Sequence, residues 1–219
     1  MRWQRSVWQA SVCIWYFSLI IGLTTGVTVV MSQYYGAKEE DKVVKTFFSS
    51  IFIALGMTIL VTVIGLLMTR PLLIVLQTPA EVLDAAVLYL RIICAGSVGT
   101  MLYNWISAVL RSLGNSVVPL IFLGISSLLN IVFDILFVAV IPMGVGGAAF
   151  ATVLAQVISG VACLLYAWKI LPMLRIRRDK LKLDTYIGKQ MLVYGLPAAL
   201  QMSIISISDM TLQAVVNTY

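Results

Sequence analysis

Long apolar stretches separated by short polar links dominate the pattern along the chain. A helix that crosses a membrane needs roughly 20 mostly apolar residues. Five stretches reach that length, and a sixth begins near the end of the chain. The predicted helices are Val12–Tyr34, Phe47–Met68, Ala86–Leu110, Val117–Ile141, Gly146–Leu171 and a last one from Lys189 onward. The pattern therefore predicts an all-α fold, a polytopic integral membrane bundle of about six transmembrane helices.

The distribution of lysine and arginine over the links predicts which side faces the cytoplasm. Short links force consecutive helices to run antiparallel, so alternate links lie on the same side. One side carries eleven basic residues: Lys38, Lys42, Lys45, Arg111, Lys169, Arg175, Arg177, Arg178, Lys180, Lys182 and Lys189. The other side carries Arg2, Arg5, Arg70 and Arg91. The basic-rich side is predicted to be cytoplasmic.

This sidedness places Met1 outside the cell, although Arg2 and Arg5 before an apolar stretch favour a cytoplasmic start. One further helix preceding Val12 would resolve the conflict. The last predicted helix runs out at Tyr219 without a polar tail. We therefore expect this chain to be a piece of a longer protein.

Composition supports a membrane protein and argues against several other classes. Hydrophobic residues make up 61% of the 219 residues and charged residues only 11%, whereas a soluble domain averages about 25% charged. The net charge of +6 is explained by the loop bias, so we expect no nucleic-acid partner. Histidine is absent and no cysteine pair has metal-ligand spacing, so zinc sites and histidine-based catalysis are not expected. We predict no enzyme activity and no cofactor.

Asp134 is the most informative single residue, because it is the one charge between Val117 and Ile141. A charge at membrane depth costs at least ~2.5–3.5 kcal/mol and usually has a function. Asn130 lies one helical turn earlier. Asp134 and Thr152 each lie nine residues from Met143, so in an antiparallel hairpin both sit about 13 Å below the turn. These two residues are predicted neighbours, although a protonated carboxyl hydrogen-bonded into the packing is the alternative.

Two further polar residues extend this predicted site. Tyr89 and Asn104 are fifteen residues apart on one predicted helix, so they share a face within roughly 60°. Asparagine and threonine also bridge membrane helices without binding a ligand, and Tyr89 has an alternative role as an interfacial anchor. A carboxylate with amide and hydroxyl oxygens suits a hard cation such as Na⁺, or a proton. We therefore predict a coupling-ion site at Asp134, Asn130 and Thr152, supported by Tyr89 and Asn104.

Four strings of residues resemble one known family in the same order and at similar spacing. They are GLTTGVTVVMSQYYGAKEEDK from Gly22, YNWISAVLRSLGNSVVP from Tyr103, NIVFDILFV from Asn130 with GVGGAAFATVLAQ from Gly144, and GLPAALQ from Gly195. The resemblance is to the multidrug and toxic compound extrusion (MATE) transporters, and it spans about Gly22 to the C-terminus.

The resemblance implies a fold of twelve helices in two six-helix bundles around a central cavity. It implies export of organic cations and other amphipathic compounds by alternating access, driven by H⁺ or Na⁺. Residues 1–182 are then the N-terminal lobe, with helices two to six, and residues 183–219 begin the C-terminal lobe with helix seven. The family's polar network matches Tyr89, Asn104, Asn130, Asp134 and Thr152 in residue type. The family's carboxylate on helix one has no counterpart, because that helix is missing.

Two alternatives stay open beside the exporter. A lipid-linked precursor flippase of the same superfamily would need inward-facing basic residues, and only Arg91 lies inside a predicted helix, near its end. An inactive truncated fragment or an assembly partner is the other alternative. The expected partners are membrane lipids, small cationic amphipathic substrates and the missing half of the transporter. The expected location is a prokaryotic plasma membrane, as a multi-pass protein.

Overall fold

The computed structural model describes residues 20–22, 24–75, 80–171 and 183–216, and these residues are almost entirely helical. The first helical residues are 20–22 and 24–36. The later helices are α2 (Glu40–Val75), α3 (Ala80–Ala95), α4 (Ser97–Ser112), α5 (Val117–Asp134), the π-helix η1 (Ile135–Val140), α6 (Gly144–Ile170) and α7 (Thr185–Val216). No strand occurs in these ranges.

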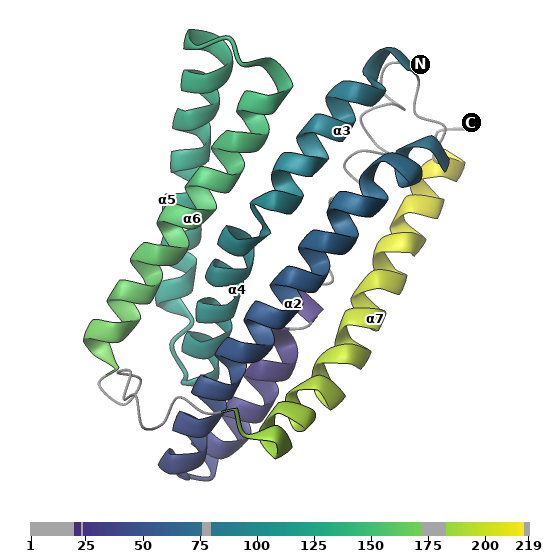
Figure 1. The fold of residues 1–219 in the computed structure, drawn as a ribbon. Helices are drawn as coiled ribbons and strands as arrows, with labels where there is room; N and C mark the ends of the chain where they lie inside the picture. Colours follow the sequence, from purple (N-terminus) through teal and green to yellow (C-terminus); the bar gives the residue numbers. More distant parts are fainter. Residues whose placement is uncertain (1–19, 23, 76–79, 172–182, 217–219) are drawn as a thin grey trace.

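The helices form one bundle of long, roughly antiparallel neighbours (Figure 1). Helix α6 packs against α3, α4 and α5, while α2 packs against α3, α4 and α7. The start of α2, the end of α4, the end of α6 and the start of α7 lie at the same end of the bundle (Figure 1). This arrangement brings the basic residues at these helix ends to one side, as the charge pattern predicts: Lys42, Lys45, Arg111, Lys169 and Lys189.

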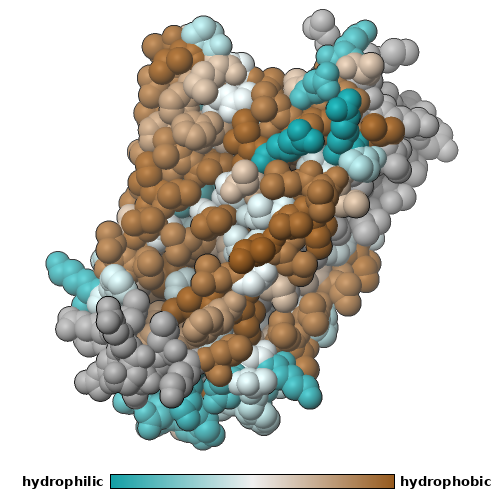
Figure 2. Space-filling model, in the orientation of Figure 1, coloured by the Kyte–Doolittle hydropathy of each residue, from teal (hydrophilic) through white to brown (hydrophobic). Residues whose placement is uncertain are grey.

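The described helices have the length and surface of membrane spans. Three of them, Glu40–Pro71, Val117–Val140 and Gly144–Ile170, are long and apolar enough to cross a membrane, and the bent pair α3–α4 adds a fourth if it is one span. Figure 2 shows apolar side chains covering most of the visible face between two more polar ends. The predicted polytopic, all-α membrane fold is confirmed.

The prediction of one straight helix over Ala86–Leu110 is wrong. The structure divides this segment into α3 and α4, which meet at 45° beside Gly96. Gly96 has ψ of 2°, far from the helical value of about −42°, and Ser97 follows it directly. Gly-Ser pairs are a common cause of sharp kinks, because glycine loses the most conformational freedom in a regular helix.

Several predicted boundaries also move. Helix α2 runs over 36 residues and continues through Pro71 into the predicted link, where Leu73 is fully buried. Helix α7 starts at Thr185, before the predicted Lys189. An apolar run marks only the part of a helix inside the membrane, and the helix itself can extend beyond that run, as residues 185–188 of α7 do. The predicted lobe boundary at residues 182 and 183 adjoins positions 172–182, which lie outside the described residues, and it stays a prediction.

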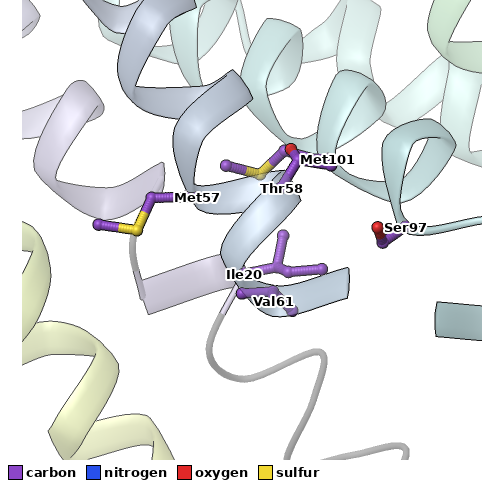
Figure 3. Close-up of a pocket in the computed structure, with 6 residues that line it drawn as sticks. All are labelled: Ile20, Met57, Thr58, Val61, Ser97 and Met101. Carbon is purple, nitrogen blue, oxygen red and sulfur yellow. The ribbon is translucent and has the colours of Figure 1, made fainter. Parts of the chain in front are cut away.

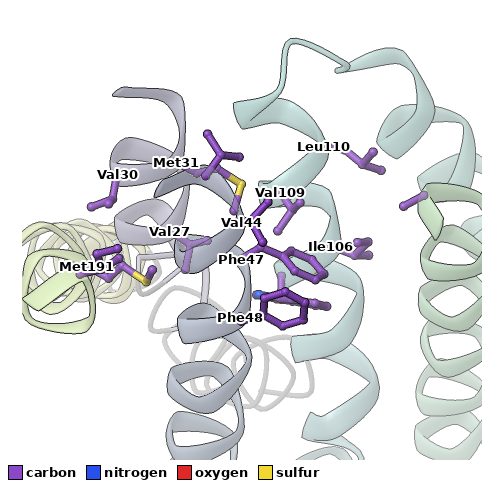
Figure 4. Close-up of a cluster of buried hydrophobic side chains, with 14 of the residues drawn as sticks. Val27, Val30, Met31, Val44, Phe47, Phe48, Ile106, Val109, Leu110 and Met191 are labelled. Carbon is purple, nitrogen blue, oxygen red and sulfur yellow. The ribbon is translucent and has the colours of Figure 1, made fainter. Parts of the chain in front are cut away.

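The largest buried cluster holds the start of α7 against the other helices. Figure 4 shows it between residues 24–36, α2, α4 and α7, with Phe47 and Phe48 of α2 at its centre. Met191 and Ile187 of α7 belong to the same cluster. Helix α7 is therefore anchored on the rest of the bundle by apolar burial along its first turns.

Candidate functional site

The turn between α5 and α6 brings the predicted site residues onto facing helices. Gly144 has φ of +61°, a left-handed conformation that glycine adopts without a steric cost. A side chain at Gly147 would collide with the Phe137 carbonyl oxygen and with Met143, so this glycine allows α6 to approach η1 closely. The predicted antiparallel hairpin is therefore present, with α5 and α6 packed along their length.

Asn130 and Thr152 meet across this hairpin. The Asn130 amide Nδ2 donates a hydrogen bond to Thr152 Oγ1 at 3.2 Å. Thr152 Oγ1 in turn donates to the Ala148 carbonyl oxygen at 3.1 Å, one turn earlier on α6. Because the amide nitrogen of Asn130 is engaged with Thr152, its carbonyl oxygen Oδ1 stays available as a ligand.

Asp134 lies one turn beyond Asn130 and is the last residue of α5 before the π-helix η1. Its side chain is half-buried, and its Oδ1 atom is fully buried without a hydrogen-bond partner among the described residues. A buried polar oxygen without a partner is costly, so such an atom calls for a ligand or a proton. The π-helix was not predicted from sequence, and π-turns are frequent at functional sites.

The polar residue on α4 reaches α6 through residues that were not predicted. Asn104 Nδ2 donates to the Thr100 carbonyl oxygen at 2.8 Å. The Thr100 hydroxyl donates to Oε1 of Gln156 on α6. Gln156 lies four residues after Thr152, and Thr100 lies four residues before Asn104. This four-residue spacing from a predicted site residue is the signal in the sequence by which Gln156 and Thr100 were recognisable.

Tyr89 lies before the bend at Gly96, on a different helix from Asn104. It lies on α3 and packs against two buried apolar clusters, one with Ile93 and Cys94 and one with Ala86 and Leu90. The bend at Gly96 separates α3 from α4, so the single-helix argument that placed Tyr89 and Asn104 on one face does not hold. A role for Tyr89 in the network stays a prediction.

A small pocket lies between Ile20, helix α2 and the start of helix α4 (Figure 3). Its lining residues are Ile20, Met57, Thr58, Val61, Ser97 and Met101. None of the predicted site residues lines it. The candidate site is therefore the polar strip on α4, α5 and α6 and not this apolar pocket.

The chemistry of the strip favours a hard monovalent cation or a proton. It offers a carboxylate, an amide carbonyl and a hydroxyl, all of them oxygen atoms. No group of three or more His, Cys, Asp or Glu side chains that could hold a metal occurs within the described ranges. Hard cations such as Na⁺ prefer oxygen ligands, and a Na⁺ site at Asp134, Asn130 and Thr152 stays a prediction.

Comparison with known proteins identifies the family. Residues 9–136, more than half of the chain, match the MatE family model. The probable multidrug resistance protein YpnP of Bacillus subtilis (strain 168) is 33% identical over 214 residues, which cover 96% of this chain and 47% of that protein. The chain thus spans about half the length of the curated relatives it matches.

Solved structures agree on the fold. An outward-facing MATE family transporter matches with a TM-score of 0.85 at 24% identity, covering 94% of this chain and 46% of that one. An inward-facing MATE family transporter matches with a TM-score of 0.83 at 24% identity, covering 93% and 46%. In fold and in sequence alike, the chain belongs to the MATE family of transporters.

Proposed function

We propose that this chain supplies the ion-coupled lobe of an exporter that moves organic cations out of a prokaryotic cell in exchange for H⁺ or Na⁺. Asp134 binds the coupling ion, and Asn130 and Thr152 supply neutral oxygen ligands. Asn104 and Tyr89 extend the polar network. Membership of a transporter family confirms that the chain is not an enzyme.

The observation that carries the proposal is the state of Asp134. Its Oδ1 atom is buried and unpaired among the described residues, while its neighbours Asn130 and Thr152 are paired with each other. An intramembrane carboxylate of this kind binds an ion or a proton in many transporters. Binding of an ion or a proton would remove the free-energy cost of leaving Asp134 Oδ1 unpaired. Occupancy by the ion and the conformation of the site are therefore linked.

The two structural matches support a lobe that moves as a unit. The chain fits an inward-facing and an outward-facing transporter almost equally well, with TM-scores of 0.83 and 0.85. In secondary transporters, access alternates largely by rocking one bundle against the other around a fixed site. The polar strip on α4, α5 and α6 lies inside one such bundle.

The flippase alternative is less well supported by the described residues. An anionic lipid headgroup requires basic side chains facing the site. Arg91 is exposed on α3, and the charged residue one helical turn from Asn130 is the carboxylate Asp134. The site therefore favours a cationic ligand.

The test is efflux of a cationic dye from vesicles carrying the 219-residue chain. A proton gradient and then a sodium gradient are imposed on the wild type, on Asp134→Asn and on Asp84→Asn. Asp84 is an exposed carboxylate on α3, so its change removes the same charge away from the site. We expect Asp134→Asn to reduce efflux to the level of empty vesicles and Asp84→Asn to leave it unchanged.

The pattern of results separates the alternatives. Normal efflux by Asp134→Asn would remove Asp134 from the coupling role. Efflux from the wild type under one gradient only would name the ion. A well-inserted wild-type chain that exports nothing would contradict the proposal for this chain and favour an assembly partner.

A further inference from the structure

Helix α6 is tied to its two neighbours by two polar contacts one turn apart. Thr152 accepts the hydrogen bond from Asn130 of α5, and Gln156 accepts the hydrogen bond from Thr100 of α4. Residues four apart lie on the same face of a helix. One face of α6 is therefore fixed to α5 by one residue and to α4 by the next.

Close packing surrounds the contact between Thr100 and Gln156. The Thr100 side chain is buried, with 3% of its surface exposed. Side chains at Gly96, the residue before α4, and at Gly99 of α4 would collide with Val153 and Val157 of α6. The two helices thus approach closely beside the hydrogen bond, on the N-terminal side of Thr100.

We propose that Gln156 is a positioning residue of the ion site, which holds Thr152 at the distance from Asp134 that ion binding requires. The inference rests on the proposed function, because it assigns a role to Gln156 only through that site. Thr100 is its partner in this role, and neither residue contacts the ion.

The physical reason is the rigidity that a cation site needs. A ligand set binds tightly when its geometry is fixed before binding, and neighbours of the ligands supply that fixation. Without Thr100, α6 keeps its link to α5 through Asn130 but loses its polar link to α4. Thr152 then lies on a less constrained helix, and ordering that helix uses part of the free energy of ion binding.

The test measures ion binding directly, without transport. The purified chain in lipid nanodiscs is unfolded by heat at increasing Na⁺, with choline keeping the ionic strength constant. A series at different pH values in choline covers the proton. An ion that binds only the folded state, present at concentration c, raises the free energy of unfolding by RT ln(1 + c/Kd), so the rise in unfolding temperature with ion concentration gives Kd, the concentration of half-saturation.

We expect Gln156→Leu and Thr100→Val each to weaken ion binding about fivefold, the equivalent of one neutral hydrogen bond. The double variant should also lose about fivefold, since both changes break the same contact. Thr100→Ser keeps the hydroxyl and should restore binding close to that of the wild type.

Ser159→Ala is the matched control. Ser159 lies on the same helix and donates a hydrogen bond to the Phe122 carbonyl oxygen of α5 at 2.7 Å. This change also removes a link between α6 and a neighbour, but it lies seven residues from Thr152. For Ser159→Ala we expect a lower unfolding temperature without ions and an unchanged half-saturation point. Gln156→Leu would give this same result if Gln156 had a purely structural role.

Three results would be decisive. The first is that Gln156→Leu leaves the half-saturation point unchanged while Asp134→Asn abolishes the stabilisation by the ion. This result would overturn the role of Gln156 and leave the proposed function intact. A wild type that no ion protects would overturn the proposed function and this inference with it. If the losses in ion affinity of the two single variants multiply in the double variant, Thr100 and Gln156 act separately, which contradicts the proposed pairing.

Discussion

Polar side chains inside the apolar helices differ in whether they have a partner. Asn130 and Thr152 are paired with each other, and Thr100 is paired with Gln156. Asp134 has a buried oxygen without a partner among the described residues. Since an unpaired buried polar atom costs more than a paired one, the carboxylate is the residue with the most to gain from a ligand.

The value of the Asn130–Thr152 pair can be measured at this scale. Thr152→Val keeps the shape of the side chain and removes the hydroxyl. We expect a loss of about 1 kcal/mol in the free energy of unfolding, because Asn130 loses its acceptor. Reversible unfolding in mixed detergent micelles gives this quantity.

Thr28→Val is the control for that change. The Thr28 hydroxyl donates only to the Thr24 carbonyl oxygen on its own helix, at 3.2 Å, as Thr152 does to Ala148. The difference between the two variants therefore isolates the contact with Asn130. Equal losses would mean that the Asn130–Thr152 contact contributes nothing to stability.

Small residues on two helices set the packing of α7 at the scale of elements. Gly22 faces Ala199, and Gly26 faces Met191 and Gly195, so the backbones of the first helix and α7 approach closely. Small residues at four-residue spacing on both partners permit such contact between membrane helices. At the basic end, Tyr34 donates a hydrogen bond to Gln190 Oε1 at 2.8 Å.

This packing predicts that a side chain at Gly26 destabilises the protein. A leucine there would meet the backbone of α7, which cannot move away as a flexible side chain can. We expect Gly26→Leu to lower the free energy of unfolding by about 1–3 kcal/mol, the usual cost of overpacking. The thermal midpoint in detergent reports the change.

Gly124→Leu supplies the comparison. Gly124 lies on α5, where an added side chain would meet nothing within 4 Å. Leucine favours helix more than glycine does, so this variant should be as stable as the wild type or more stable. Similar destabilisation by both changes would show that α7 is not seated on the first helix in solution.

At the scale of the whole molecule, the described helices present an extensive apolar exterior that suits a lipid bilayer. Large apolar side chains of α5 are exposed along its length, among them Leu120, Leu128 and Ile131. In water such a surface would cause aggregation. Within a bilayer it is the ordinary lipid-facing side of a multi-pass protein.

A lysine scan of α5 tests the orientation in the membrane. Leu128 and Val117 are almost equally exposed, at 64% and 63%, but Leu128 lies eleven residues further along α5. We expect Leu128→Lys to lower the membrane-integrated fraction, because a central charge costs at least ~2.5–3.5 kcal/mol. Val117→Lys lies at the basic end, where lysine reaches the headgroups, and should insert normally. Alkaline carbonate extraction measures both, and equal insertion would contradict the assigned orientation.

Apolar length, loop charge and the isolated Asp134 were sufficient to predict the all-α membrane bundle, the shared side of the basic links and the α5–α6 hairpin. These features depend on the free energy of transferring side chains between water and lipid. The residues of each segment determine that free energy without reference to the other segments. Equal distances from the turn predicted Asp134 as the neighbour of Thr152, whereas the structure pairs Thr152 with Asn130, one helical turn before Asp134.

Other features were decided only by contacts between segments distant in sequence. Gly96, at the bend, lies directly against Val153 of α6, and the π-helix after Asp134 adjoins the turn into α6. The pairing of Thr100 with Gln156 requires a register between α4 and α6 that glycine packing sets. A helical pattern specifies which face is apolar, but neighbouring backbones determine the bend, the register and the partner of each polar group.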